Sequence, residues 1–143
     1  MLLLLICYAF FIIMAYFYYV AKILTGKAAL LELMIMDYFL QWIITSNFRS
    51  KGKYCLYLAV SFSLEGIYLL LALFLIKNPG FMMFTIFLLS FEIVHLVASV
   101  HSVYEFFKNR RPFKKIFDFR IERCSALFLF THALVLVLFI LYM

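Results

Sequence analysis

Charged residues are scarce in this sequence of 143 residues: they make up 14% of it, against 69% for hydrophobic residues. A water-soluble domain of this length needs a polar exterior, so the composition excludes a soluble globular protein. The chain also lacks the alternation of apolar and polar residues, in segments of about ten, that a membrane β-barrel requires. Helices are then the remaining way to satisfy the backbone in lipid.

Cysteines are few as well. Cys7, Cys55 and Cys124 are too far apart for a zinc motif, and their odd number gives no disulfide framework. The net charge is +6, but no soluble basic domain is present that could bind nucleic acid. We therefore expect no nucleic-acid partner. The positive charge is interpreted as a signal for membrane orientation and as attraction to anionic lipid headgroups.

Five apolar runs of about twenty residues follow one another, each long enough to cross about 30 Å of hydrocarbon as a helix. They predict an all-α polytopic membrane bundle, a single domain of residues 1–143, with five transmembrane helices at about 2–24, 28–46, 54–76, 81–104 and 124–142. The first run lacks the charged start and cleavage site of a signal peptide, so we expect it to be retained. It also lacks a polar stripe, which predicts a peripheral position in the bundle.

Basic residues concentrate before the last span, where Pro112 ends any helix continuing from the span before it. Residues 106–123 mix basic and apolar side chains, which predicts a short interfacial segment in the headgroup plane. The residues expected to contact anionic headgroups are Lys114, Lys115, Arg120 and Arg123. Because basic loops stay in the cytoplasm, five spans predict a cytoplasmic N-terminus and a C-terminus on the opposite side.

Several ionisable residues lie deep inside the apolar runs, where each one is energetically unfavourable unless it faces the bundle interior. If the basic residues that flank each run mark the two membrane surfaces, four of the ionisable residues lie near the middle of a span: Asp37, Glu65, Glu92 and His132. Gln41 lies one helical turn after Asp37, on the same face. We therefore expect the set to converge as a pathway for an ion, formed by Asp37, Gln41, Glu65, Glu92, His95 and His132.

Glu92 and His95 are the only ionisable pair one helical turn apart inside a span, so we expect them at the functional centre. The favoured function is translocation of protons or a small cation, because buried carboxylates and imidazole can exchange protons near neutral pH. A chain this short is expected to form a homo-oligomer or to join a partner membrane subunit.

Two other functions fit the same residues. One is a membrane-embedded enzyme, metal-dependent or acid–base, that acts on a lipid or isoprenoid substrate with Glu92, His95 and Glu65 as catalytic groups. Its divalent metal would be held by Glu92, His95 and His132, since Glu-x-x-His spacing lets both side chains reach one ion. The other is a haem protein with His95 and His132 as axial ligands, or a non-catalytic anchor subunit of a larger complex.

Overall fold

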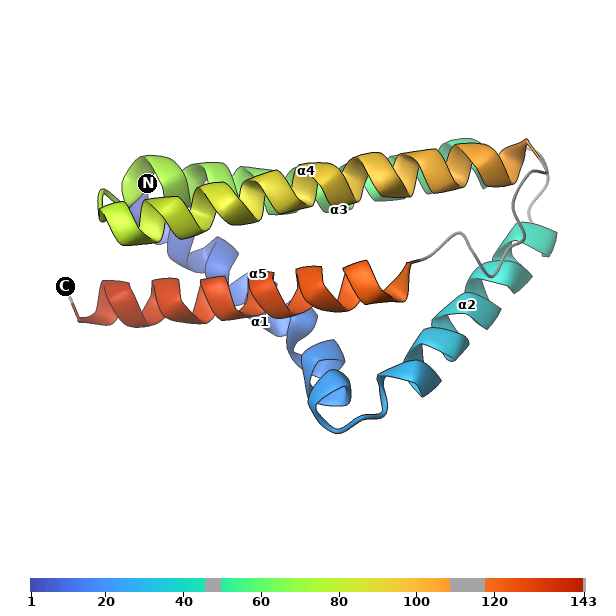
Figure 1. Ribbon diagram of the computed structural model, residues 1–143, viewed down its shortest axis with the longest axis horizontal. Coiled ribbons are helices and arrows are strands. Elements are labelled where there is room, and N and C mark those ends of the chain that lie inside the picture. Colours follow the sequence, from blue (N-terminus) through green and yellow to red (C-terminus); the bar gives the residue numbers. More distant parts are fainter. Residues whose placement is uncertain (46–49, 109–117, 143) are drawn as a thin grey trace.

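The computed structural model describes residues 1–45, 50–108 and 118–142, with side chains outside residues 43–55. This part of the chain forms five α-helices: α1 (Leu2–Leu24), α2 (Ala28–Thr45), α3 (Ser50–Leu75), α4 (Pro79–Phe107) and α5 (Phe119–Leu141). The predicted all-α bundle is confirmed. In Figure 1, α3, α4 and α5 follow the long axis of the molecule, while α1 crosses beside α5 at a steep incline.

Four helices in the described part of the chain are long and apolar enough to cross a membrane. They are α1, residues Leu56–Leu75 of α3, α4 and α5. The chain is therefore a multi-pass integral membrane protein. Residues 28–46, expected as a further span, form α2 as far as residue 45, and the side chains of residues 43–45 lie outside the described part of the chain.

Local sequence signals set the helix ends. Gly26 follows the last turn of α1 with a φ of 70°, a left-handed conformation that glycine adopts readily, and the chain reverses there. Asn78 caps α4 by accepting a hydrogen bond from the Phe81 N–H at 3.1 Å. Asp118 caps α5 by accepting one from the Arg120 N–H at 3.1 Å.

The interfacial segment predicted at residues 106–123 is divided differently in the structure. Its first residues complete α4, and residues 119–123 form the first turn of α5, which begins before the expected position 124. The cap at Asp118 explains the early start, because it supplies an acceptor for the free N–H groups of the first turn. Residues 109–117 lie outside the described part of the chain.

The main core lies where α1, α3, α4 and α5 meet. Its buried apolar residues recur at helical spacing on each helix, as Leu5, Ala9 and Ile12 do on α1. Ala133 of α5 belongs to the same cluster, and small side chains allow close approach of membrane helices. The prediction of a peripheral first span is wrong. Among the described residues, the contact between α1 and α5 is the most extensive between any two helices.

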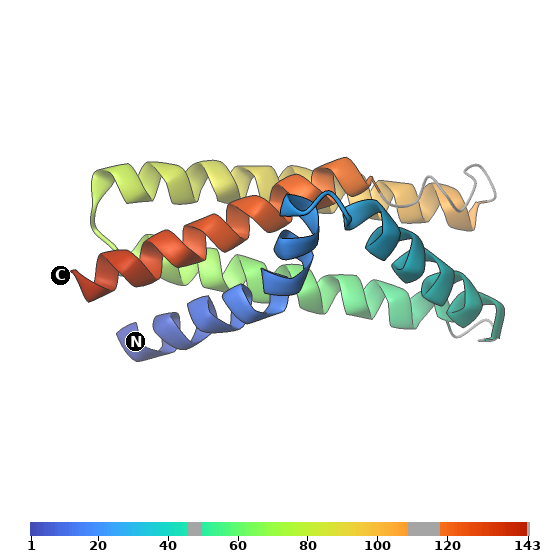
Figure 2. The same ribbon diagram turned by 90° about the horizontal axis from the view of Figure 1, so that it is seen from below.

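A second, smaller cluster joins α2 to the far end of the hairpin formed by α3 and α4. Val103 is buried at its centre, with Phe39 and Trp42 of α2 and Leu58 of α3 among the residues around it. At the opposite end of the molecule, Figures 1 and 2 show both ends of the chain beside the turn between α3 and α4.

Candidate functional site

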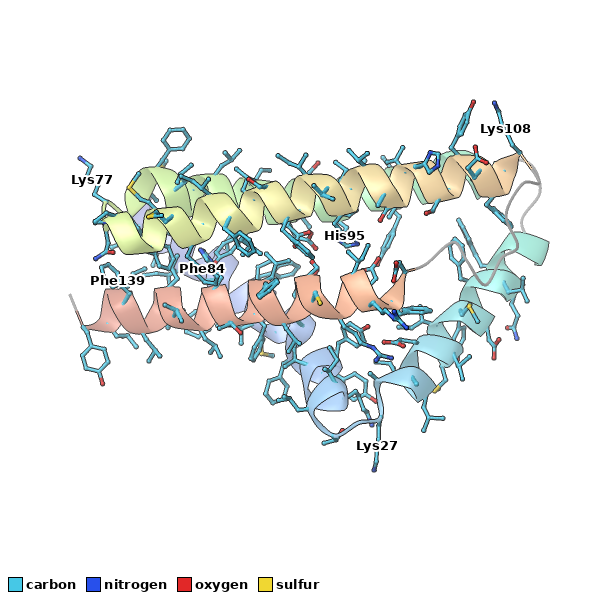
Figure 3. The ribbon with its side chains drawn as sticks, viewed as in Figure 1. Lys27, Lys77, Phe84, His95, Lys108 and Phe139 are labelled. Atoms are coloured by element: carbon cyan, nitrogen blue, oxygen red, sulfur yellow. The ribbon has the colours of Figure 1, made fainter. Side chains whose placement is uncertain are left out.

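His95 connects two carboxylates from different helices. It lies on the buried face of α4 one turn after Glu92, and its Nδ1 is 3.2 Å from Oε2 of that residue. Its Nε2 is 3.1 Å from Oε1 of Glu122, at the start of α5. The side chains of His95 and Glu92 are 6% and 5% exposed, whereas that of Glu122 is 37% exposed. The imidazole thus links a buried acid to one that reaches the surface, and Figure 3 shows His95 between α4 and α5.

Ser125 completes this group from α5. Its hydroxyl donates a hydrogen bond of 2.6 Å to Oε1 of Glu92, so both oxygens of that carboxylate have a partner. Ser125 lies three residues after Glu122, and this spacing puts both side chains on one face of α5. We refer to Glu92, His95, Glu122 and Ser125 as the His95 network.

A second buried acid lies next to this network. The hydroxyl of Tyr16 on α1 donates a short hydrogen bond to Oε1 of Glu65 on α3. Glu65 is buried, and its carboxylate also interacts electrostatically with Glu92, His95 and Glu122. Acidic, imidazole and hydroxyl groups from four helices therefore meet in one region of the bundle.

Glu32 of α2 forms a separate ion pair with α5. Its two oxygens accept hydrogen bonds of 2.6 Å from Nε and Nη2 of Arg123, in a bidentate arrangement. Tyr19 donates a further hydrogen bond of 2.8 Å to the same carboxylate. Hydrogen bonding from the Arg123 guanidinium holds the pKa of Glu32 below its ordinary value, even though burial acts in the opposite direction.

His132 is buried in different surroundings. Its Nδ1 is 2.7 Å from the Tyr68 hydroxyl, and its Nε2 is 2.9 Å from the Thr85 hydroxyl. The Thr85 hydroxyl donates its hydrogen to the Phe81 carbonyl, so it must accept a hydrogen bond from the N–H at Nε2 of His132. Nδ1 then carries no hydrogen and accepts a hydrogen bond from the Tyr68 hydroxyl. These bonds describe a neutral imidazole with both nitrogens satisfied. The ring of Phe84 packs beside it, with centroids 5.2 Å apart.

The predicted pathway residues are therefore brought together only in part. Glu65, Glu92 and His95 lie in one region, as expected. His132 is buried, but its hydrogen bonds go to hydroxyl groups. Asp37 and Gln41 are exposed on α2, outside the region where these three residues meet.

Two of the three residues proposed to hold a metal lie together, because Glu92 and His95 are in contact. The third, His132, faces Tyr68 and Thr85 instead of a carboxylate. In the described part of the chain, no group of three histidine, cysteine or acidic residues is arranged to hold one ion. Both ring nitrogens of His132 have hydroxyl partners, so the nitrogen that an axial haem ligand would use is already hydrogen-bonded.

The four residues expected at lipid headgroups differ in their surroundings. Arg120 is exposed on the first turn of α5, as a headgroup contact requires. Arg123 is instead engaged by the carboxylate of Glu32, which was not considered in the sequence-based prediction. Lys114 and Lys115 lie outside the described residues.

Sequence reasoning missed Tyr16, Glu32 and Glu122. Glu122 lies between basic residues, so it was included in the interfacial segment, and Glu32 lies near the start of an apolar run and not at its middle. A usable signal was available for Glu122, because Ser125 follows it by three residues and the pair forms a polar face at the start of an apolar helix. No comparable pattern in the sequence identifies Tyr16 among the ten tyrosines.

We compared the chain with family models, curated proteins and solved structures, and none of them matches it. The functional argument therefore depends on the geometry of the His95 network.

Proposed function

We propose that this protein conducts protons from the cytoplasmic surface into the membrane through the His95 network. The position of His95 between a buried carboxylate and a partly exposed one is the observation that supports this proposal. Imidazole suits such a position because it can accept a proton on one ring nitrogen and release another from the second.

The proposed path follows hydrogen bonds that are already present. A proton taken from water by Glu122 passes to Nε2 of His95 across 3.1 Å. The ring then releases a proton from Nδ1 to Glu92 across 3.2 Å. Ser125 holds the receiving carboxylate in place, and Glu65 is the next acid within electrostatic range. The network thus gains one proton from water, which Glu92 holds until it passes it on. His95 then carries its hydrogen on Nε2 and must return it to Nδ1 before the next transfer.

The basic residues orient this path. Lys108 at the end of α4 and Arg120 and Arg123 at the start of α5 lie at the end of α5 that carries Glu122. We place this end in the cytoplasm by the positive-inside rule, and the C-terminal end of α5 on the opposite side. Five crossings would put the N-terminus in the cytoplasm, as the sequence predicted, whereas four would put it on the side of the C-terminus.

The path within one chain ends near Glu65 and Tyr16, in the middle of the bundle. Complete translocation therefore requires another element, and we propose that a second copy of the chain supplies it. Anionic lipid headgroups would meet the exposed Arg120 at the cytoplasmic surface.

The alternative of an embedded acid–base enzyme would use the same buried residues. An enzyme that used Glu92 and His95 for acid–base chemistry would still require both residues, so the two functions are separated by measuring proton flux without any substrate.

The test uses purified protein in lipid vesicles that contain a pH-sensitive dye. A potassium gradient with valinomycin supplies the driving voltage. We expect proton flux above that of empty vesicles, and we expect Glu92→Gln to abolish it, because the amide keeps the size of the side chain but exchanges no proton. Asp37→Asn is the matched control, since the structure leaves this acid outside the network, and its flux should stay normal. Normal flux in well-folded Glu92→Gln, or wild-type flux equal to that of empty vesicles, would contradict the proposal.

A further inference from the structure

The ion pair between Glu32 and Arg123 constrains how the chain crosses the membrane. Glu32 lies just over one turn into α2, and Arg123 just over one turn into α5. With five crossings, α2 and α5 would begin on opposite membrane faces, separated by about 30 Å of hydrocarbon. The two side chains are instead joined by two hydrogen bonds of 2.6 Å. The start of α2 therefore lies on the same face as the start of α5.

The other end of α2 is attached to the same end of the bundle. Phe39 and Trp42 pack in the cluster around Val103, near the end of α4. The chain leaves α4 at Lys108 and returns at the start of α5, so both of these helix ends belong to one membrane face. Both ends of α2 are thus held at that face, and a helix that crossed the membrane would have its ends on different faces.

The labelled lysines in Figure 3 show the same arrangement along the long axis of the molecule. Lys77 lies at the end formed by the turn between α3 and α4. Lys27, in the turn between α1 and α2, lies below the bundle, only slightly past the level of His95 and well short of Lys108. Lys77 is much farther from Lys27 along this axis, at the opposite end of the molecule.

The exposed side chains of α2 indicate the environment that this helix faces. Buried side chains are confined to one narrow stripe of Ala28, Glu32 and Met36. On the opposite face, the apolar residues Leu30, Met34 and Tyr38 are 66%, 58% and 72% exposed, and the exposed polar residues Asp37 and Gln41 lie among them. Lys22 and Lys27 flank the turn that precedes the helix and supply positive charge at its start. A face that exposes both apolar and polar side chains, beside basic residues, fits the boundary between acyl chains and anionic headgroups.

We infer that α2 does not cross the membrane but lies in the cytoplasmic leaflet, with Leu30, Met34 and Tyr38 in contact with its lipids. The chain then crosses four times, through α1, α3, α4 and α5, and Met1 lies on the same side as Tyr142. This inference does not depend on proton conduction, because it follows from the contacts of α2 alone.

Cysteine labelling decides the number of crossings. In the full chain with Cys7, Cys55 and Cys124 changed to alanine, single cysteines are placed by Lys27→Cys, Lys77→Cys and Lys108→Cys, all at exposed positions. A membrane-impermeant maleimide is applied to sealed vesicles of known orientation. We expect Lys27→Cys to react from the same side as Lys108→Cys and from the side opposite to Lys77→Cys. Five crossings require Lys27→Cys and Lys77→Cys to react from one side, and that result would overturn the inference.

A depth measurement tests the lipid contact. A bimane fluorophore is attached to Met34→Cys in the same background, in vesicles whose lipids carry a quencher at a shallow or a deep acyl position. We expect stronger quenching by the shallow lipid, because an interfacial helix buries its apolar face only about 5–10 Å into the headgroup and acyl boundary. Stronger quenching by the deep lipid would indicate a spanning helix. Quenching by neither would show that protein or water covers this face, and both results contradict the lipid contact.

Discussion

The two buried histidines differ in what surrounds them, although both lie inside apolar helices of one bundle. His95 has a carboxylate at each ring nitrogen, and one of these carboxylates reaches the surface. His132 has a hydroxyl group at each ring nitrogen and aromatic rings around it. Carboxylates exchange protons near neutral pH, whereas tyrosine and threonine hydroxyls hold theirs. The comparison teaches that the neighbours of a buried histidine, more than its depth, determine whether it can move a proton.

The largest expected effect comes from removing the imidazole that connects the two acids. His95→Gln should lower proton flux by about 100-fold, because an amide cannot take over proton transfer. His132→Gln should leave flux per folded molecule unchanged. Both variants are measured in vesicles at equal amounts of folded protein. An equal loss of flux in the two variants would show that His132 also belongs to the proton path.

A smaller effect is expected on stability. His132→Leu leaves the buried hydroxyl of Tyr68 without its partner, which should lower the free energy of unfolding by about 1–3 kcal/mol. Unfolding in mixed detergent micelles measures this change, with the exposed Thr131→Val on the same helix as a control. If His132→Leu unfolds like the wild type, the hydroxyl partners do not stabilise the bundle as the structure indicates.

The smallest effect concerns the exposed end of the His95 network. Glu122→Gln should lower proton flux about two- to fivefold, because an acid with this exposure interacts with His95 by roughly 0.5–1 kcal/mol, and water can reach the imidazole in its place. Flux of this variant is compared with that of Glu92→Gln in the same vesicles. A loss as complete as that of Glu92→Gln would show that Glu122 is the obligatory entry point.

The helices themselves could be predicted closely from the sequence. The run at 2–24 coincides with α1, because the Gly26 signal and the apolar length agree there. The predicted first residues of α4 and α5 differ from those in the structure. Asn78 and Asp118 cap the starts of these helices, and both lie before the apolar runs on which the prediction depends. A hydropathy pattern identifies residues that lie in the hydrocarbon region, whereas the hydrogen bonds that cap a helix form outside that region.

The candidate site could be predicted only in part. Depth along a helix identified Glu92 and His95, since both lie on one face of a single helix. Depth alone could not show that Glu65 lies near the His95 network and His132 does not, because the partners of each residue come from other helices. Asp37 lies at the depth of the other pathway residues only if residues 28–46 cross the membrane. The contact between Glu32 and Arg123, 91 residues apart in the chain, has no signature in the local sequence.

The position of α5 has a consequence for the order in which the protein assembles during its synthesis. Glu32, Glu92 and His95 all depend on α5 for a partner, and α1 has its most extensive packing there too. A ribosome that has completed α1 to α4 therefore leaves three ionisable side chains without their final partners until α5 is made. A chain that stops before Phe119 should be recognised and degraded by membrane proteases, and the bundle should close only when α5 inserts.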